Sequence, residues 1–265
     1  NPSELTIENT RRIAISLIAG FATIVATWHR IRQDKEPVPP DQELGHAENF
    51  LYMMTGRKPE TDVASFMDTC LVLHAEHSFN ASTFSARQVC STLAHMYAAV
   101  SAAVGSLSGE LHGGANARVM HMLKEIGTKD VIQEYVEKKL EAGEKIMGMG
   151  HAVYKHGDPR ARILAPMSKK MGQKVNETKW YELSAALADT AQNVFKEKKG
   201  GEIFPNVDFY SASLYYTMGI PIDLFTPVFS VSRIAGWAAH IIEEQFAGAA
   251  AKPALYRPSS DYIGE

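Results

Sequence analysis

The sequence predicts an all-α protein. Its apolar residues recur at the helical period, alternation with a period of two is almost absent, and no Asn-Gly or Asp-Gly hairpin turn occurs. The chain has 265 residues, 45% of them hydrophobic, which is enough to bury a large core in one or two domains. This ordinary composition excludes disordered, collagen-like and low-complexity proteins. A net charge of −3 indicates no general affinity for nucleic acid or acidic membranes.

The expected helices follow one another along the whole chain. The first should be mostly buried, because apolar residues lie around most of its circumference. Thr61 is the candidate N-cap of the third, and Gly56 and Gly109 should end the second and fourth. The expected helices cover residues 13–31, 45–55, 61–76, 82–106, 131–141, 163–171, 180–199, 206–218 and 223–246.

Two long uncharged stretches raise the question of membrane insertion. Residues 13–28 number 16, short of the roughly 20 that a membrane helix needs. Residues 88–109 are interrupted by Ser, Thr, Gln and His, which are costly in lipid. We therefore expect both stretches to be buried in a globular core. Cys70 and Cys90 are too few for a disulfide framework and should be buried thiols of a reducing compartment.

Residues 122–204 differ in composition from the sequence around them. They are richer in Lys and Glu and hold mostly short amphipathic helices, whereas the flanking stretches are apolar and rich in small residues. This difference predicts a solvated lobe inserted into a more buried body. A mobile lobe that closes on a larger body is a common catalytic arrangement.

Three of the histidines in the first half of the chain are candidate site residues. His74 and His77 are three residues apart and share a helix face, but the metalloprotease motif needs a spacing of four. No Cys pair or further His–carboxylate cluster indicates zinc, so no metal site is predicted. These two are either hydrogen-bonded core histidines or donors to an anion. His112 is followed by two glycines, which permit close approach of a ligand, and by Asn116, which could orient it.

A fourth histidine, His151, begins a segment dense in polar residues. The preceding Gly-Met-Gly is a weak phosphate-loop signal, since no strand comes before it. Pro159 is a suitable first residue of the next helix. Arg160 would then point from a helix N-terminus, where backbone N–H groups also favour anions. Lys155 and Asp158 complete the segment.

The remaining candidates lie in the last third of the chain. Asn206 is a plausible N-cap and Asp208 a first-turn acid, so both have a structural explanation when taken alone. Arg233 is the only Lys or Arg between residues 224 and 240, and a nearly buried arginine needs a carboxylate from the protein or from a ligand. Arg257 lies near the C-terminus, where arginines are usually solvated.

Taken together, these residue types fit one kind of chemistry. The arginine fork pairs carboxylates in a bidentate manner, which suits a dicarboxylate. Histidine can polarise a carbonyl, and a carboxylate can remove a proton next to one. The set therefore favours enolisation followed by carbon–carbon bond formation.

As an ordered set, these segments resemble the citrate synthase family from about residue 8 to residue 264. The resemblance implies an all-α homodimer whose small domain closes over oxaloacetate and acyl-CoA. The implied domains are a large one over 1–112 and 220–265 and a small one over 113–219. The segments that carry the resemblance are 74–82, 112–116, 148–160, 205–211, 229–236 and 257–264. The form of the first two resembles the prokaryotic branch.

The resemblance also implies a role for each residue. Asp208 matches the base that takes a proton from acetyl-CoA, and His112 matches the residue that stabilises the resulting enol. His151 matches the residue that polarises the oxaloacetate ketone and helps to protonate the alkoxide. The other implied oxaloacetate ligands are His77, Arg160, Arg233 and Arg257, the last supplied across the dimer. His74 and Asn80 are expected to line the site, and Met147, Gly148, Met149, Gly150 and Lys155 to contact CoA.

The implied reaction condenses acetyl-CoA, oxaloacetate and water to citrate and CoA, as in the tricarboxylic acid cycle, with no metal or bound cofactor. A close alternative is 2-methylcitrate synthase, which uses propionyl-CoA; one methylene is worth only about 1–3 kcal/mol. A second alternative is an inactive fragment or binding module that keeps the site without turnover. The prokaryotic resemblance implies a cytoplasmic protein, with an organelle-targeting peptide in a missing N-terminus as the other possibility.

Family members carry a further N-terminal part of the large domain, which we expect this chain to lack, since it opens Asn-Pro-Ser without Met. Apolar surface on the first helices would then be uncovered. We predict poor solubility or compensating association, measured by size-exclusion chromatography. Elution as a stable, soluble monomer would contradict this prediction.

Overall fold

The computed structural model describes residues 4–110, 112–246 and 255–264, and it contains helices but no strand in these ranges, which confirms the all-α fold class. An isolated bridge between Met149 and Pro205 is the one β contact in the described residues. The 3₁₀ turns are η1 (Lys129–Val131) and η2 (Ile222–Leu224). The α-helices are α1 (Ile7–Ile31), α2 (His46–Thr55), α3 (Thr61–Ala75), α4 (Ala81–Cys90), α5 (Met96–Leu107), α6 (Ala115–Ile126), α7 (Ile132–Glu141), α8 (Pro159–Lys174), α9 (Lys179–Lys199), α10 (Val207–Thr217) and α11 (Phe225–Phe246).

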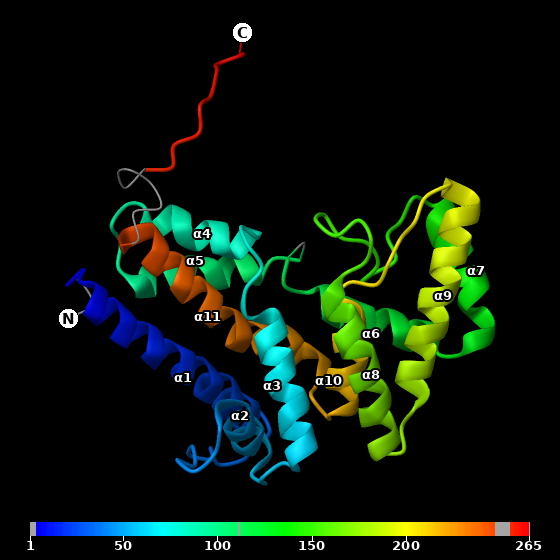
Figure 1. The fold of residues 1–265 in the computed structure, drawn as a ribbon, viewed down its shortest axis with the longest axis horizontal. Helices are drawn as coiled ribbons and strands as arrows, with labels where there is room; N and C mark the ends of the chain where they lie inside the picture. The colour runs from blue at the N-terminus through cyan, green and yellow to red at the C-terminus, as the bar shows by residue number, and fades with distance from the viewer. Residues whose placement is uncertain (1–3, 111, 247–254, 265) are drawn as a thin grey trace.

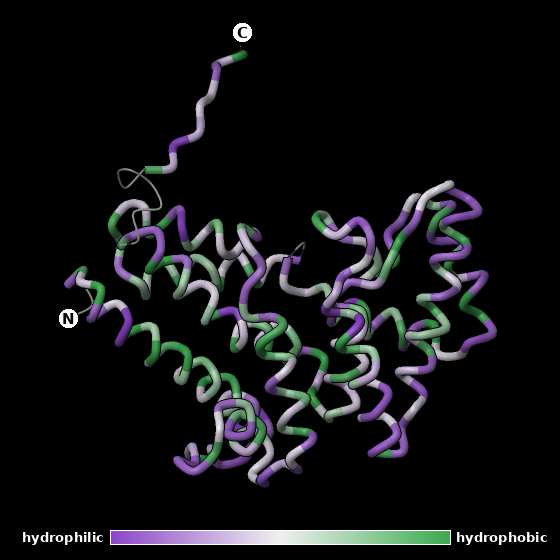
Figure 2. Tube along the Cα trace, viewed as in Figure 1, coloured by the Kyte–Doolittle hydropathy of each residue, from purple (hydrophilic) through white to green (hydrophobic). Residues whose placement is uncertain are grey.

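The helices form two groups in space. Helices α1–α5 and α11 lie on one side, α6–α9 lie on the other, and α10 lies near the middle (Figure 1). The outer helices α7 and α9 show long hydrophilic stretches, in keeping with the composition of residues 122–204 (Figure 2). The expected domain boundaries stay a prediction, because one core cluster holds both Met120 of α6 and Phe225 of α11.

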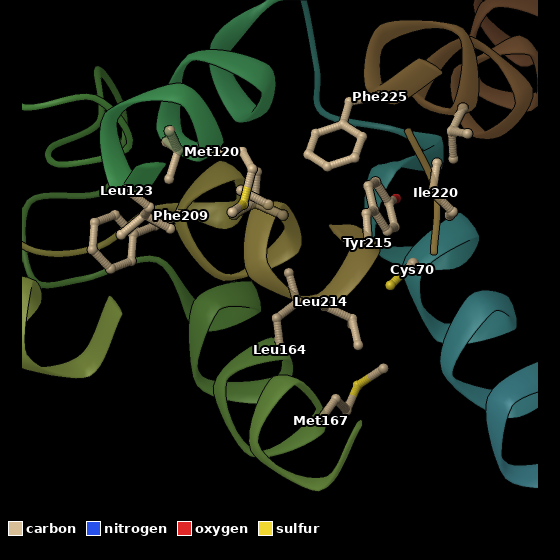
Figure 3. Packing of buried hydrophobic residues seen from close by; sticks show 14 of the residues in the cluster. Cys70, Met120, Leu123, Leu164, Met167, Phe209, Leu214, Tyr215, Ile220 and Phe225 are labelled. Carbon is tan, nitrogen blue, oxygen red and sulfur yellow. The ribbon is translucent and has the colours of Figure 1, made fainter. Parts of the chain in front are cut away.

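Helix α10 is the central element of the largest core. Its buried residues Phe209, Leu214 and Tyr215 point to different neighbours (Figure 3). Around them lie Met120 and Leu123 of α6, Leu164 and Met167 of α8, and Cys70 of α3. Burial of such large side chains is worth about 1.5–3 kcal/mol each. The core therefore fixes where the first turn of α10 lies.

Helix α1 is more exposed than the sequence predicts. Ile15 is 69% exposed, Ile24 65% and Trp28 57%. One face packs against α2 and α11, while no described residue covers the opposite apolar face. The prediction of a mostly buried first helix is therefore wrong, because an apolar circumference shows only that burial is possible, and a neighbour must supply it.

Helix α1 is also long and apolar enough to cross a membrane. It runs for 25 residues, beyond the uncharged stretch counted in the sequence, and its best 18-residue window has a mean hydropathy of 1.4. Core helices of globular proteins share these properties. Ala22, Val25 and Ala26 pack into the largest core cluster, but only 33% of the apolar window is buried.

The expected long helix over residues 82–106 is wrong, because two helices occupy this stretch. Leu93 takes a left-handed φ of 64° between α4 and α5. His95 then caps α5, its Nδ1 accepting from the backbone N–H of Ala98 at 3.2 Å. The apolar stretch 88–109 therefore does not form one continuous helix. The N-cap prediction for Thr61 is off by one residue, since Glu60 occupies the cap of α3.

Helix α11 crosses the end of α3 at Gly236. A Cβ on this glycine would lie 2.2 Å from the carbonyl oxygen of Ala75 and 3.2 Å from the Cα of Glu76. Only a glycine permits this approach, which brings α11 against the segment that carries His77.

We predict that Gly236→Ala lowers the free energy of unfolding by about 1–3 kcal/mol, because the backbones must separate. Urea unfolding measures this loss. The matched control is Gly20→Ala in α1, where nothing lies within 4 Å of a new Cβ. The control should be neutral or stabilising by up to about 1 kcal/mol. Equal effects of the two changes would contradict the packing argument.

Candidate active site

A small polar cavity of about 140 Å³ collects most of the candidate residues. A larger groove of about 550 Å³ between α1, α5 and α11 has no titratable lining residue, so it offers no acid–base chemistry. Within the described ranges, no group of three or more His, Cys, Asp or Glu could hold a metal ion. The polar cavity is lined by His77, Asn80, His112, Gly113, His151, Arg160, Val207, Asp208, Phe229 and Arg233.

His112 is held by Ser82 at the start of α4. The backbone N–H of Ser82 donates to His112 Nε2 at 3.2 Å, and the Ser82 hydroxyl lies 2.8 Å from the same nitrogen. The indole N–H of Trp237 donates to that hydroxyl at 3.1 Å. A backbone N–H can only donate, so Nε2 is the acceptor and the ring proton of neutral His112 lies on Nδ1. Ser82 lies inside the motif 74–82, but its contact with His112, 30 residues away, was not predicted.

His151 is held by the turn that follows it. Its Nδ1 accepts from the backbone N–H groups of Val153 at 3.0 Å and Tyr154 at 3.3 Å. By the same argument, the ring proton of neutral His151 lies on Nε2. Burial, with nearby Arg160, lowers the pKa of His151, and burial, with Arg233, lowers that of His112. Both rings are therefore neutral donors near pH 7.

Asp158 joins the starts of α8 and α10. Its carboxylate accepts from the backbone N, Nε and Nη2 of Arg160 at 3.0, 3.0 and 2.8 Å, and from the backbone N of Val207 at 3.0 Å. Burial alone would raise the pKa of Asp158, but the hydrogen bonds from Arg160 outweigh it and hold the pKa below its usual value. Asp158 was not among the predicted site residues, although an acid before Pro159 is a typical N-cap.

Asp208 lies in the first turn of α10. The side chain of Asn206 caps this helix and accepts from the Asp208 backbone N–H at 3.0 Å, as the sequence predicts. The Asp208 carboxylate has no hydrogen-bond partner in the described residues. Burial raises its pKa to about 6, against the opposing effect of Arg160. The group is thus a poorly solvated carboxylate at the cavity wall, suited to accept a proton.

Arg233 is a buried cation with no protein carboxylate at ion-pair distance in the described part of the chain. It is 2% exposed, and its Nε donates to the backbone oxygen of His74 at 2.7 Å. Its guanidinium lies over the ring of Phe229, 4.7 Å from the centroid. Burial, with the nearby charge of Arg160, lowers its pKa to about 10. Such a group favours an anionic ligand.

His74 supports the cavity from behind and does not line it. The ring is fully buried, its Nδ1–H donates to the Cys70 carbonyl at 2.7 Å, and burial lowers its pKa to about 4. Asn80 does line the cavity. It caps α4 through Thr83 N at 3.1 Å and donates to the His77 carbonyl at 3.3 Å, and its Oδ1 lies 2.9 Å from the Ser82 hydroxyl oxygen. The buried thiols of Cys70 and Cys90 agree with the sequence prediction.

The glycine segment before His151 lies beside the cap of α10 and outside the cavity lining. The backbone N of Gly150 donates to Phe204 O at 2.7 Å, and Asn206 N donates to Gly148 O at 2.8 Å. Gly148 has a φ of 74°, and a Cβ there would lie 2.7 Å from Val119 Cγ2, so glycine is required. The expected CoA contacts of Met147, Gly148, Met149, Gly150 and Lys155 stay a prediction.

Arg257 is not brought to the cavity of its own chain. It is exposed and belongs to the extended segment 255–264, which runs away from the helices (Figure 1). At the start of this segment, Tyr256 donates a hydrogen bond to Glu244 at 2.9 Å. Its expected supply across a dimer stays a prediction.

Comparison with known proteins identifies the family. Residues 2–259 match the family described as "Citrate synthase, C-terminal domain". Citrate synthase 2 of Bacillus subtilis is 49% identical over 257 residues, which cover 97% of this chain and 66% of the relative. A 2-methylcitrate synthase of Mycobacterium tuberculosis is 42% identical over 264 residues, which cover 100% of this chain and 64% of the relative.

A solved structure shows the same likeness. It is the ternary complex of citrate synthase from Thermoplasma acidophilum with carboxymethyl coenzyme A and oxaloacetate, with a TM-score of 0.87 and 31% identity, covering 97% of this chain and 67% of that chain. The chain therefore belongs to the citrate synthase family, as the ordered motifs predicted. It spans about two thirds of the length of the relatives that it matches.

We predict that Asp208→Asn stabilises the protein by about 2 kcal/mol more at pH 8 than at pH 4.5. The carboxyl ionises near pH 3.8 when unfolded and near 6 when folded. The folded state therefore binds more protons between these values, and its stability falls as pH rises through them. Thermal unfolding at the two pH values measures the difference. Asp189→Asn, on the exposed face of α9, is the control. A stabilisation that is equal at both pH values would contradict the prediction.

Proposed function

We propose that this protein is a citrate synthase, which condenses acetyl-CoA with oxaloacetate and water to give citrate and CoA. The observation that carries the proposal is the pair Arg233 and Arg160 at one small cavity. Among the residues that the structure describes, Arg233 is buried without a carboxylate partner, and Arg160 has a single one, Asp158. Two guanidinium groups at the cavity wall match a ligand with two carboxylates. Oxaloacetate is such a ligand, and it is bound in the Thermoplasma acidophilum complex.

The first proposed step is formation of an enol from acetyl-CoA. Asp208, with a pKa of about 6, is ionised near pH 7 and removes a proton from the methyl group. The C–H electron pair forms the C=C bond, and negative charge develops on the thioester oxygen. The Nδ1–H of His112 donates to that oxygen. Because Ser82 holds the ring in advance, this stabilisation needs no reorganisation during the reaction.

The second proposed step is carbon–carbon bond formation. The Nε2–H of His151 polarises the ketone of oxaloacetate, and the enol carbon attacks the ketone carbon. The carbonyl electron pair moves to oxygen, which takes a proton by way of His151. Water then attacks the thioester carbonyl of citryl-CoA, CoA leaves as the thiol, and the proton on Asp208 returns to solvent. Solvent supplies the proton that reaches the alkoxide through His151, and the proton that the attacking water loses goes to the leaving thiolate, so the protons balance. We propose that no bound cofactor takes part.

We propose further that the protein acts as a homodimer in which Arg257 completes the oxaloacetate site of the other copy. Its place on an extended segment, away from the cavity of its own chain, supports this arrangement. Closure of the lobe over 113–219 would exclude water until condensation is complete. The glycine segment 147–150 and Lys155 are proposed to hold CoA. Relatives from bacteria and an archaeon support a cytoplasmic location and a place in the tricarboxylic acid cycle.

The alternative substrate is propionyl-CoA, which a 2-methylcitrate synthase relative supports. We favour acetyl-CoA because the B. subtilis citrate synthase is 49% identical and the M. tuberculosis enzyme 42%. The two substrates differ by one methylene, so the assay must compare both.

We predict CoA-thiol release in the presence of oxaloacetate, faster with acetyl-CoA than with propionyl-CoA. Asp208→Ala should slow release by about 10²–10⁴-fold, because the base is lost. Asp189→Ala on α9 is the matched control and should leave the rate unchanged. No release with either thioester would overturn the enzyme proposal, and near-normal activity of Asp208→Ala would overturn the assignment of the base.

A further inference from the structure

Tyr154 touches three of the proposed oxaloacetate ligands. It lies between α7 and α8, and its hydroxyl is 3.2 Å from His77 Nε2. Its ring centroid lies 4.8 Å from that of His151 and 5.5 Å from that of His77. The guanidinium of Arg160 lies over the same ring at 5.6 Å. One phenol thus connects the α3–α4 loop with the segment that begins α8.

The hydroxyl of Tyr154 affects which ring nitrogen of His77 carries the proton. Burial, with the charge of Arg160, lowers the pKa of His77, so the ring is neutral near pH 7 and carries one proton. The only hydrogen bond of this ring in the described residues is the one to Tyr154. The phenol can donate to Nε2 or accept from Nε2–H. Donation leaves the ring proton on Nδ1 as a donor to a ligand, whereas acceptance would use the single proton of neutral His77 on Tyr154. Without the phenol, nothing in the described structure selects one tautomer or ring orientation.

The ring acts on the approach to Arg160. The edge of this guanidinium is occupied by Asp158, through Nε and Nη2. The aromatic ring lies over its face, a favourable place for a cation. A ligand carboxylate can therefore reach this guanidinium only from the Nη1 side. The main chain of Tyr154 also donates to His151, so one residue positions both histidines.

We propose that Tyr154 is a positioning residue of the dicarboxylate site, fixing the ring and tautomer of His77 and walling one face of Arg160. This inference rests on the proposed function. The simpler alternative is an aromatic that only fills space between the two histidines. The two differ at the hydroxyl, which a filler does not use.

Tyr154→Phe removes the hydroxyl and keeps the ring. We expect the KM and the calorimetric Kd for oxaloacetate to rise about five- to tenfold, the effect of one lost hydrogen bond, with kcat changed less than twofold. The matched control is Tyr135→Phe on α7, which removes a hydroxyl bonded to Glu125 at 3.2 Å and should leave both constants unchanged. Unchanged oxaloacetate affinity in Tyr154→Phe would overturn the inference.

The ¹⁵N signals of the imidazole nitrogens supply a readout that space filling would not change. His77 is assigned by the signal lost in His77→Gln. In the unmodified protein His77 should carry its proton on Nδ1, and in Tyr154→Phe the two tautomers should mix. An unchanged His77 signal would overturn the inference. If the unmodified protein neither binds oxaloacetate nor releases CoA, the proposed function itself is wrong, and this inference is overturned with it.

Discussion

The buried carboxylate of Asp158 is the interaction on which the site depends. It accepts four hydrogen bonds, three from Arg160 and one from the backbone of Val207. It therefore fixes a cation at the start of α8 and, next to Val207, the first turn of α10 with Asp208. Large side chains on three faces hold α10 in the core. The positions of Asp208 and Arg160 thus both depend on the carboxylate of Asp158.

The remaining side chains of the site form two sets, and hydrogen bonds connect the members of each set. Asn206 donates a hydrogen bond to Gly150, next to His151, and caps the helix that carries Asp208. His151 and Asp208 are therefore expected to move together. Asn80 and Ser82 connect the His77 loop to His112 in the other set. A hydrogen bond between Tyr154 and His77 connects the two sets. A change in how the sets approach each other would alter several ligand contacts at once.

Much of this arrangement could be predicted from the sequence, for reasons that are local. Asn206 and Pro159 begin helices because capping and a fixed φ act within a few residues. The ordered motifs indicated His112, His151 and Asp208, which the structure brings to one cavity. Their roles stay predictions. The features that were predicted wrongly or missed depend on residues far away in the sequence. The break at Leu93, the exposed face of α1 and the tautomer set by Ser82 all need neighbours that periodicity does not reveal.

The unpaired burial of Arg233 also has a consequence for the lifetime of the protein in a cell. In the described residues this cation has no carboxylate partner, so an anion that binds it in the folded state and does not bind the unfolded chain stabilises the fold. At 100 times its dissociation constant, such a ligand adds about 2.7 kcal/mol. Differences of this size change the unfolded fraction that proteases encounter. If the proposed dicarboxylate is that anion, the abundance of the protein would follow its supply, and scarcity of the ligand would also shorten the life of the chain.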